Sequence, residues 1–286
     1  MKRAAKVVYP SDLSDEQWRL AAPVLRRACG RGGRVPRREV LNAIFYVLRT
    51  RCQWRYLPQS YPKWKTVYSC FRRWSLNGVW DQVLESLRVQ VRYSQGRKAL
   101  PTAAVVDTRR GHPKRPDERK RGRTGYDGAK KVKGRKRVEL CDMGGSVLEV
   151  VVVPANTDER TCALAVLIKA KKSAWSQNLQ TIFADSGFAG REFEAQVQEQ
   201  LGFVLHIVHR DKEQAGFVPL PKRWLIEQVF GCQGRNRRLS RDYEQKTYIS
   251  RAAIQVTNLH RWLRHLAPAP SDDPPFRYRN QTPTSL

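Results

Sequence analysis

The sequence has no long apolar run, and this excludes one large class of proteins. A helix needs ~18 consecutive apolar residues to cross a bilayer, and no stretch of this 286-residue chain approaches that length. The first residues, MKRAAKVVYPSD, lack the apolar stretch and the small-residue cleavage site of a signal peptide. We therefore expect a cytoplasmic protein with no membrane partner.

Paired cysteines are missing as well. The six cysteines are scattered, and no two have the Cys-x-x-Cys spacing of zinc ribbons and redox motifs. Several lie inside apolar stretches, which favours reduced, buried thiols over disulfides. His206 and His209 form an isolated His-x-x-His without a Cys or acidic partner at zinc spacing, so we predict no metal site there.

Acidic residues are scarce relative to basic ones. The chain has 54 Lys and Arg against 26 Asp and Glu, which gives a formal net charge of +28 and a pI near 10.5. A surface this positive repels itself unless it meets a polyanion, and the commonest polyanion is nucleic acid. The composition therefore predicts a nucleic-acid-binding protein, while a hydrophobic share of 41% is enough for a globular core.

Residues 1–95 have the patterns of helices and are predicted to form a helical DNA-binding domain. Ser14 and Gln17 make a capping box for the first helix, and Thr66 is positioned to cap the third. The polar segment 94–101, which ends in proline, marks the expected domain boundary. The four helices are expected near residues 14–25, 36–48, 66–76 and 80–91.

Residues 96–266 mix strands and helices and are predicted to form the second domain. Gly144-Gly145 is a hairpin turn between two strands. The order is strand, hairpin, helix, strand, helix, strand, helix, which is that of an RNase H-like α/β core with a mixed sheet flanked by helices. Residues 267–286 are rich in Pro, Asp and Ser and are predicted to be disordered. The strands are expected at 103–106, 137–142, 146–153, 179–184 and 203–208, and the helices at 157–172, 192–201, 222–232 and 250–266.

Two aspartates stand where apolar strands end. Asp107 follows TAAVV and Asp185 follows LQTIFA, and a carboxylate at this end of a buried strand lies at the sheet edge where α/β proteins place their sites. Each alone is weak evidence, because Asp also begins turns. Glu227 lies among apolar neighbours in the predicted helix KRWLIEQVF, where a charge is costly unless a metal or a partner compensates. Its simpler interpretation is an ion pair with Arg223, worth at most ~0.5 kcal/mol.

The three acids together carry more weight than any one of them. Phosphodiester cleavage can use two hard cations ~4 Å apart, one activating the nucleophile and one stabilising the leaving oxygen. Hard cations prefer oxygen ligands, and clustered carboxylates raise one another's pKa when no metal is bound. In a chain this basic, an acidic cluster on buried elements predicts a metal site.

Long ordered blocks of the sequence resemble bacterial insertion-sequence transposases of the IS5 type, which are DDE transposases. The resemblance covers about residues 11–266 and is far more specific than three acids. Its N-terminal blocks are LSDEQWRLAAPVL, GGRVPRREVLNAIFYVLRTRCQWRYLP, WKTVYSCFRRW and NGVW. Its catalytic blocks are VVDTRRG, GYDGAKKVKGRKR, IFADSGFAG and RWLIEQVFGCQGRNRRLSRDYE.

The resemblance implies roles for particular residues. Asp107, Asp185 and Glu227 become the catalytic triad, which binds two Mg²⁺ ions that Mn²⁺ can replace. Arg223 becomes the arginine of the family's final motif. The residues expected to grip DNA phosphates after this motif are Arg235, Arg237 and Arg238.

The sequence also departs from the family pattern. Thr108 stands where the group often has Ser, Leu220 where the wider group favours Tyr, and Gly234 where it favours Lys. The assignment of a phosphate-contacting Lys is therefore open, and Arg235 is a possible substitute.

A basic segment directly after Asp107 is the predicted DNA-binding surface of the catalytic part. Residues 109–137 contain fourteen Lys and Arg against three acids. Charge runs are usually solvated loops, but DNA at Asp107 would lie beside this one, and such contacts position DNA without reading its sequence. The residues assigned to this surface are Lys130, Lys131, Lys133, Arg135 and Lys136.

Base reading is assigned to the N-terminal helices. Lys65, Arg72 and Arg73 on the third helix can enter a groove of DNA. The connection 51–64 is too long for a tight helix-turn-helix, so the likeness to that motif is loose.

The resemblance therefore implies a DNA transposase that binds terminal inverted repeats, cleaves DNA to expose a 3′-OH and transfers that end into target DNA. Its partners would be double-stranded DNA, both element ends and target, and further copies of itself in a dimer or larger synaptic complex. It would be associated with the nucleoid in the bacterial cytoplasm. Two alternatives stay open: a structure-selective nuclease without strand transfer, and a transposase-derived protein that only binds DNA.

Overall fold

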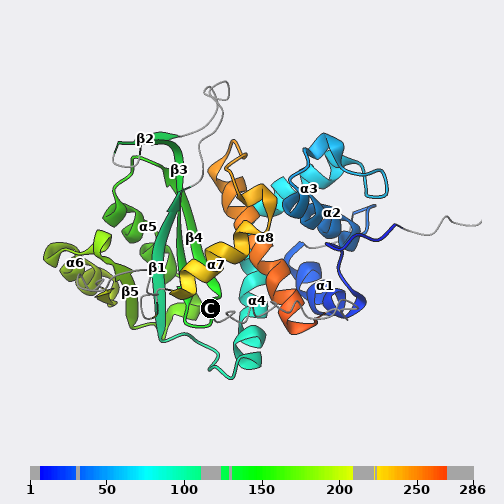
Figure 1. Cartoon of the computed structure of the whole chain (residues 1–286). Coiled ribbons are helices and arrows are strands. Elements are labelled where there is room, and N and C mark those ends of the chain that lie inside the picture. The colour runs from blue at the N-terminus through cyan, green and yellow to red at the C-terminus, as the bar shows by residue number, and fades with distance from the viewer. Residues whose placement is uncertain are drawn as a thin grey trace, which may run out of the picture.

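The structure is a computed structural model that describes residues 7–29, 33–110, 124–128, 131–208, 222 and 224–268. In this part of the chain a group of N-terminal helices packs against one side of a sheet-containing region (Figure 1). Within the same residues, no helix is long and apolar enough to cross a membrane.

The four predicted N-terminal helices are present. The capping box is confirmed, because the Ser14 N–H donates to Gln17 Oε1 at 3.2 Å and the Gln17 N–H donates to Ser14 Oγ at 3.2 Å. The prediction that Thr66 caps the third helix is wrong, since that helix begins at Trp64 and Thr66 lies in its first turn. The helices are α1 (Asp15–Cys29), α2 (Arg37–Thr50), α3 (Trp64–Leu76) and α4 (Val79–Ser94), with the 3-10 turn η1 (Trp54–Tyr56) between α2 and α3.

The sheet has the mixed topology expected of an RNase H-like core, which confirms the predicted fold class. Strand β3 lies between β4 and β1 and pairs antiparallel with both, whereas β1, β5 and β6 run parallel. The predicted hairpin is the β3–β4 pair. The strands are β1 (Ala103–Arg110), β3 (Val132–Asp142), β4 (Val147–Pro154), β5 (Thr181–Asp185) and β6 (Val204–Val208).

Strand β2 (Gly125–Asp127) was not predicted. It pairs antiparallel with residues 132–134 of β3, so β3 begins five residues before the predicted start at Arg137. The segment VKGRKR has no apolar run or alternation that signals a strand. Its extended conformation is fixed by long-range pairing instead.

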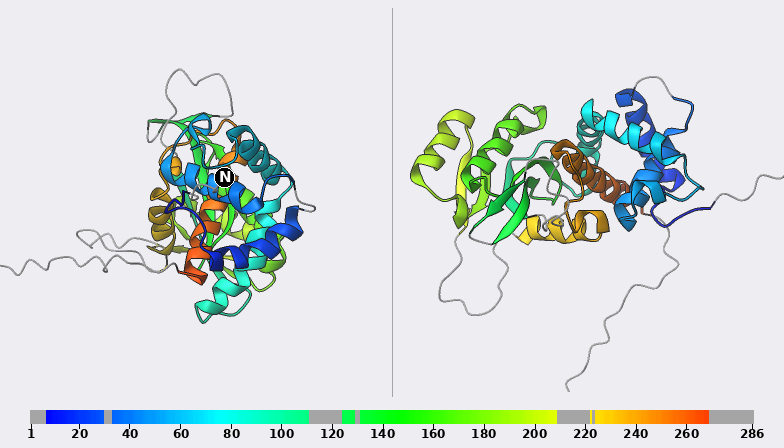
Figure 2. Two further views of the ribbon diagram at one scale, coloured as in Figure 1. Left: turned by 90° about the vertical axis from the view of Figure 1, so that its right-hand side faces the viewer. Right: turned by 90° about the horizontal axis from the view of Figure 1, so that it is seen from above.

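The two faces of the sheet belong to two hydrophobic clusters. Alternate residues of β1 point in opposite directions: Ala104 and Val106 join one cluster, and Val105 joins the other. Helices α5 (Glu159–Lys171) and α6 (Arg191–Leu201) cover the first face, and α7 (Trp224–Gly234) and α8 (Thr247–Leu266) cover the second. Seen from above, the layers run from α5 and α6 through the sheet to α7 and α8, and then to the N-terminal helices (Figure 2).

Helix α8 connects the N-terminal helices to the sheet. Its Arg251 donates to Asp81 of α4 at 2.6 Å and to Glu149 of β4 at 2.8 Å. A second link joins Arg92 of α4 to Asp142 at the end of β3, where both side chains are buried. The hydrophobic cluster on this face contains residues of α1 to α4 as well as of α7, α8 and the sheet. The position of α7 over the sheet therefore depends on packing that includes the N-terminal helices.

Candidate active site

The face of β1 that carries Asp107 is the face covered by α7. Asp107 has the same orientation along the strand as Val105, which packs with Ile226, Val229 and Phe230 of α7. Two residues further on, the Arg109 guanidinium donates to the Phe230 carbonyl. Asp107 itself is buried, with 8% of its surface exposed, and its carboxylate accepts the Thr108 N–H at 2.7 Å.

The register of β1 and β5 relates Asp185 to Asp107. Strands β1 and β5 pair in parallel from Ala103 opposite Thr181 to Val105 opposite Phe183. The same register, continued by two residues, places Asp107 level with Asp185. Phe183 packs with the α7 cluster, so alternation directs Asp185 to the α7 side as well. Asp185 is the last residue of β5, but β1 continues to Arg110, so the prediction that Asp107 ends its strand is wrong. The parallel register of the two strands is what brings the two acids level.

Glu227 lies in the first turn of α7, the helix that packs against β1. The premise that apolar neighbours bury its charge is wrong. Ile226, Val229 and Phe230 turn toward the sheet, whereas the Glu227 side chain is exposed. An amphipathic helix separates residues that are adjacent in sequence, so a charge between apolar letters is not a buried charge.

The three acids approach the same region from three elements, but they do not form a ready metal cage. Within the described ranges, no group of three or more His, Cys, Asp or Glu side chains is arranged to hold a metal ion. The structure thus brings Asp107 and Asp185 to one sheet edge and Glu227 to the helix above it, without closing the site around an ion.

A fourth carboxylate belongs to this region and was missed in the sequence. Glu139 on β3 is directly opposite Asp107 in the antiparallel ladder and is fully buried. Its Oε2 accepts the Gln233 Nε2 of α7 at 2.6 Å, which ties the far end of α7 to the sheet. Burial raises the Glu139 pKa to about 7. No local sequence motif marks Glu139, because its place opposite Asp107 depends on the register of β1 and β3.

Two of the predicted DNA-reading residues line a basic groove. Lys65 and Arg73 of α3 border a cavity of about 510 Å³ between α3 and the segment before α2. Arg34 and Arg37 border it from the opposite wall. Arg72 is exposed next to Arg73 but does not line the groove. The arrangement is a concave surface with basic side chains on both walls.

Three of the predicted DNA-contacting residues are instead structural. Arg135 is 1% exposed and donates to Asp242 and to the Glu244 carbonyl. Lys136 is 4% exposed and donates to the Thr157 carbonyl at 2.8 Å. Arg238 is 9% exposed and donates to Glu244 Oε1 at 2.7 Å. The assignment of Arg135, Lys136 and Arg238 to a DNA surface is therefore wrong, because their charges are already neutralised or hydrogen-bonded inside the protein.

The other predicted contacts divide between exposed residues and residues that cannot be placed. Lys131 and Lys133 are exposed near the start of β3. Arg235 and Arg237 are exposed directly after α7. Lys130 and Arg223, together with residues 111–123 of the basic segment and the tail from 269 onward, lie outside the described residues.

Comparison with known proteins connects this geometry to a family. Residues 13–84 match the model "Putative transposase of IS4/5 family", and residues 102–256 match the model "Transposase DDE domain". The chain is also 36% identical over 89 residues to the "Insertion element IS402 uncharacterized 16.2 kDa protein" of Burkholderia cepacia. That similarity covers 28% of this chain and 60% of the relative's length.

The second match covers more than half of the chain. It includes the sheet, the neighbouring Asp107 and Asp185, and the Glu227 helix. This protein belongs to the DDE transposase family.

Proposed function

We propose that this protein is a transposase that binds the terminal inverted repeats of an insertion sequence and catalyses DNA strand cleavage and strand transfer. The observation that carries the proposal is the parallel register of β1 and β5. Continued two residues past Val105 and Phe183, it brings Asp107 level with Asp185 on the face that the helix of Glu227 covers. The DDE family match and the net charge of +28 support it.

The residues at this site fit a divalent cation. Carboxylate oxygens are the ligands that hard cations prefer, and Asp107, Asp185 and Glu227 would hold two Mg²⁺ ions, with Mn²⁺ as a substitute. The chemistry that such ions would supply is activation of the attacking hydroxyl and stabilisation of the leaving oxygen. The proposal requires the three acids to converge when metal and DNA are present.

The protein's own side chains have separate tasks in this proposal. Asp107 is held by its β1 backbone and by the Thr108 N–H, so its position is set before metal binds. Asp185 accepts the Gly187 N–H at 3.0 Å, which fixes the turn after β5. Glu227 is on an exposed turn, where DNA can reach it.

DNA binding and catalysis are assigned to different parts of the chain. Residues 1–95 bind DNA, with Lys65, Arg72 and Arg73 on the surface that meets the duplex. Residues 96–266 carry catalysis. The exposed side chains proposed to position the DNA backbone near the acids are Lys131, Lys133, Arg235 and Arg237.

Because two element ends must be joined, the active form is a homodimer or a larger synaptic complex on double-stranded DNA. Both element ends and target DNA are substrates. The site of action is the nucleoid in the bacterial cytoplasm.

The acids are tested by single substitutions on a DNA substrate built from the sequence that flanks the gene. Asp107→Asn, Asp185→Asn and Glu227→Gln should each abolish metal-dependent cleavage while inverted-repeat binding persists in a gel-shift assay. Chelation with EDTA should have the same effect on the unaltered protein. Glu199→Gln is the matched control, because Glu199 is an exposed acid on α6, on the opposite side of the sheet. Full cleavage by the Asp185→Asn protein would overturn the site.

Two other functions are separated by the same assays. A structure-selective nuclease would give cleaved DNA but no joined products in the presence of target DNA. A protein that only binds DNA would give no cleavage with Mg²⁺ or Mn²⁺ on its cognate ends.

A further inference from the structure

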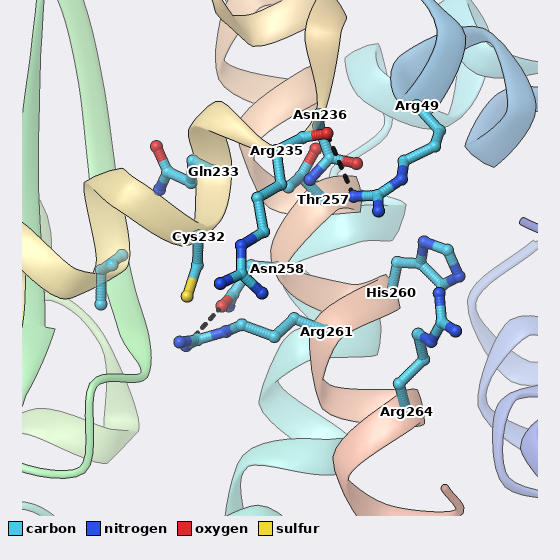
Figure 3. A pocket seen from close by; sticks show the side chains of 11 residues that line it. Arg49, Cys232, Gln233, Arg235, Asn236, Thr257, Asn258, His260, Arg261 and Arg264 are labelled. Carbon is cyan, nitrogen blue, oxygen red and sulfur yellow. Dashed lines mark hydrogen bonds between the residues drawn. The ribbon is translucent and has the colours of Figure 1, made fainter. Parts of the chain in front are cut away.

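A basic cavity lies between the N-terminal helices and the helix of Glu227. It has a volume of about 330 Å³ and is bordered by α2, by α7 with the residues after it, and by α8 (Figure 3). Its walls carry four arginines and no acidic residue, counted over the described part of the chain. The arginines are Arg49, Arg235, Arg261 and Arg264.

The arginines repel one another across this cavity. Burial lowers the pKa of Arg49, and the charges of Arg264 and Arg235 lower it further. Arg49 is oriented by donating to the Arg235 carbonyl at 3.0 Å, and Arg261 donates to the Gly145 carbonyl. The guanidinium groups of Arg235 and Arg264 make no hydrogen bond or ion pair with any other described residue. The cluster therefore lacks the negative charge that would stabilise it.

Two buried polar side chains in the walls also have atoms without a hydrogen-bond partner, although the Asn258 Oδ1 accepts from Arg261 at 3.2 Å. Asn258 is 2% exposed and Thr257 is 4% exposed, and neither the Asn258 Nδ2 nor the Thr257 Oγ has a hydrogen-bond partner in the described structure. A buried donor without a partner is unfavourable, because it has lost its hydrogen bonds to water. Arginine side chains and unused hydrogen-bond donors that face one cavity can bind an oxyanion, because an oxyanion offers several acceptor oxygens and a negative charge.

We propose that this cavity binds one phosphate group of a DNA strand. This contact adds to those proposed at the three acids and at the basic groove lined by Lys65 and Arg73. The inference rests on the proposed transposase function and adds a phosphate-binding site to it. A DNA phosphate is favoured over a free anion because the cavity joins α2 of the N-terminal helices to the helix of Glu227. A strand that is held by both parts of the protein passes this position.

The cavity is also connected to the acids through α7. Gln233 lines the cavity and donates to Glu139 at 2.6 Å, and Glu139 lies opposite Asp107 on the sheet. A phosphate in the cavity thus contacts the helix whose first turn carries Glu227. Occupation of the cavity steadies that helix against the sheet when the DNA end is bound.

The test measures binding of a fluorescent inverted-repeat duplex by anisotropy over a series of KCl concentrations. The variants are Arg264→Gln and the double variant Arg49→Gln/Arg264→Gln. Each phosphate contact contributes about one unit to the slope of log K against log salt concentration. The double variant should therefore lose about one unit of slope in total, because both arginines serve a single phosphate. Arg264→Lys should keep the slope.

Lys169→Gln is the matched control for the single variant Arg264→Gln, since it removes one positive charge from an exposed position on α5, on the opposite face of the sheet. Circular dichroism melting of each variant checks that it is folded. A double variant that is folded and binds with the slope of the unaltered protein overturns the inference.

A second arm separates the possible sources of the phosphate. Saturable binding of inorganic phosphate to the unaltered protein, lost in the double variant while the DNA slope is unchanged, would assign the cavity to a free anion and overturn the DNA assignment. If the unaltered protein does not bind the duplex at all, the proposed function fails together with this inference. Normal binding by the unaltered protein with an unchanged slope in the double variant overturns this inference alone.

Discussion

His260 gives a pH-dependent prediction whose size can be worked from the structure. This residue of α8 is 6% exposed and stacks on Phe45 of α2, with ring centroids 4.1 Å apart and planes 10° apart. Burial, followed by the nearby charges of Arg264 and Arg49, lowers its pKa from 6.5 to about 3. The folded protein therefore holds a neutral imidazole between an aromatic ring and two cations.

The direction of this pH dependence follows from the lowered pKa of His260, which is a basic group. The unfolded chain binds the proton more tightly than the folded one, so the stabilisation is complete above pH 6.5 and is lost as the pH falls toward 3. Each pH unit between these values costs ~1.4 kcal/mol. Lowering the pH from 7 to 5 should thus remove on the order of 2 kcal/mol of unfolding free energy through His260 alone.

The assay compares urea unfolding of the unaltered protein and of His260→Gln at pH 7 and pH 5 at constant ionic strength. Losing the stack on Phe45 lowers the stability of the variant at both pH values, so the informative quantity is the change between them. Other titrating groups, including Glu139, are the same in both proteins and cancel to first order. The unaltered protein should lose about 2 kcal/mol more than the variant on acidification. Equal losses in the two proteins would refute a buried, neutral His260.

Two further predictions concern stability. Asp242→Ala leaves the Arg135 charge buried without its carboxylate, so the free energy of unfolding should fall by about 3–5 kcal/mol in a urea titration; a loss below ~1 kcal/mol would show that water reaches Arg135. Ser14→Ala removes one half of the capping box of α1 and should cost about 1 kcal/mol by thermal unfolding, whereas Ser14→Asp, which can still accept the Gln17 N–H, should restore most of it.

Local patterns determined most elements of this protein, with the exception of β2 and the start of β3. The capping box of Ser14 and Gln17, the hairpin at Gly144-Gly145 and the apolar runs that end at Asp107 and Asp185 each depend on neighbours within a few residues. Hydrogen bonding and hydrophobic periodicity act over that range, so the order of strands and helices, and with it the RNase H-like fold, can be predicted from the sequence. Cys141 and Cys162 are buried, as expected for thiols inside apolar stretches, whereas the other four cysteines are partly exposed.

Long-range packing decided which charges are available for function. Arg135 and Lys133 stand two residues apart in one basic run, yet the first is buried against Asp242 and the second is exposed. The sequence cannot distinguish them, because burial depends on what covers that face of the sheet. Glu227 is the opposite case, a charge that its apolar sequence neighbours suggest is buried but that is exposed. Those neighbours pack against the sheet, and Glu227 does not.

The sequence by itself determined the fold class, the excess of positive charge and the acids that end the apolar runs, because each of these follows from composition or from a short-range pattern. Only the tertiary structure decided that Glu139 lies opposite Asp107 and that arginines from α2, α7 and α8 share one cavity. These residues are far apart in the chain, and strand register and helix packing are what bring them together.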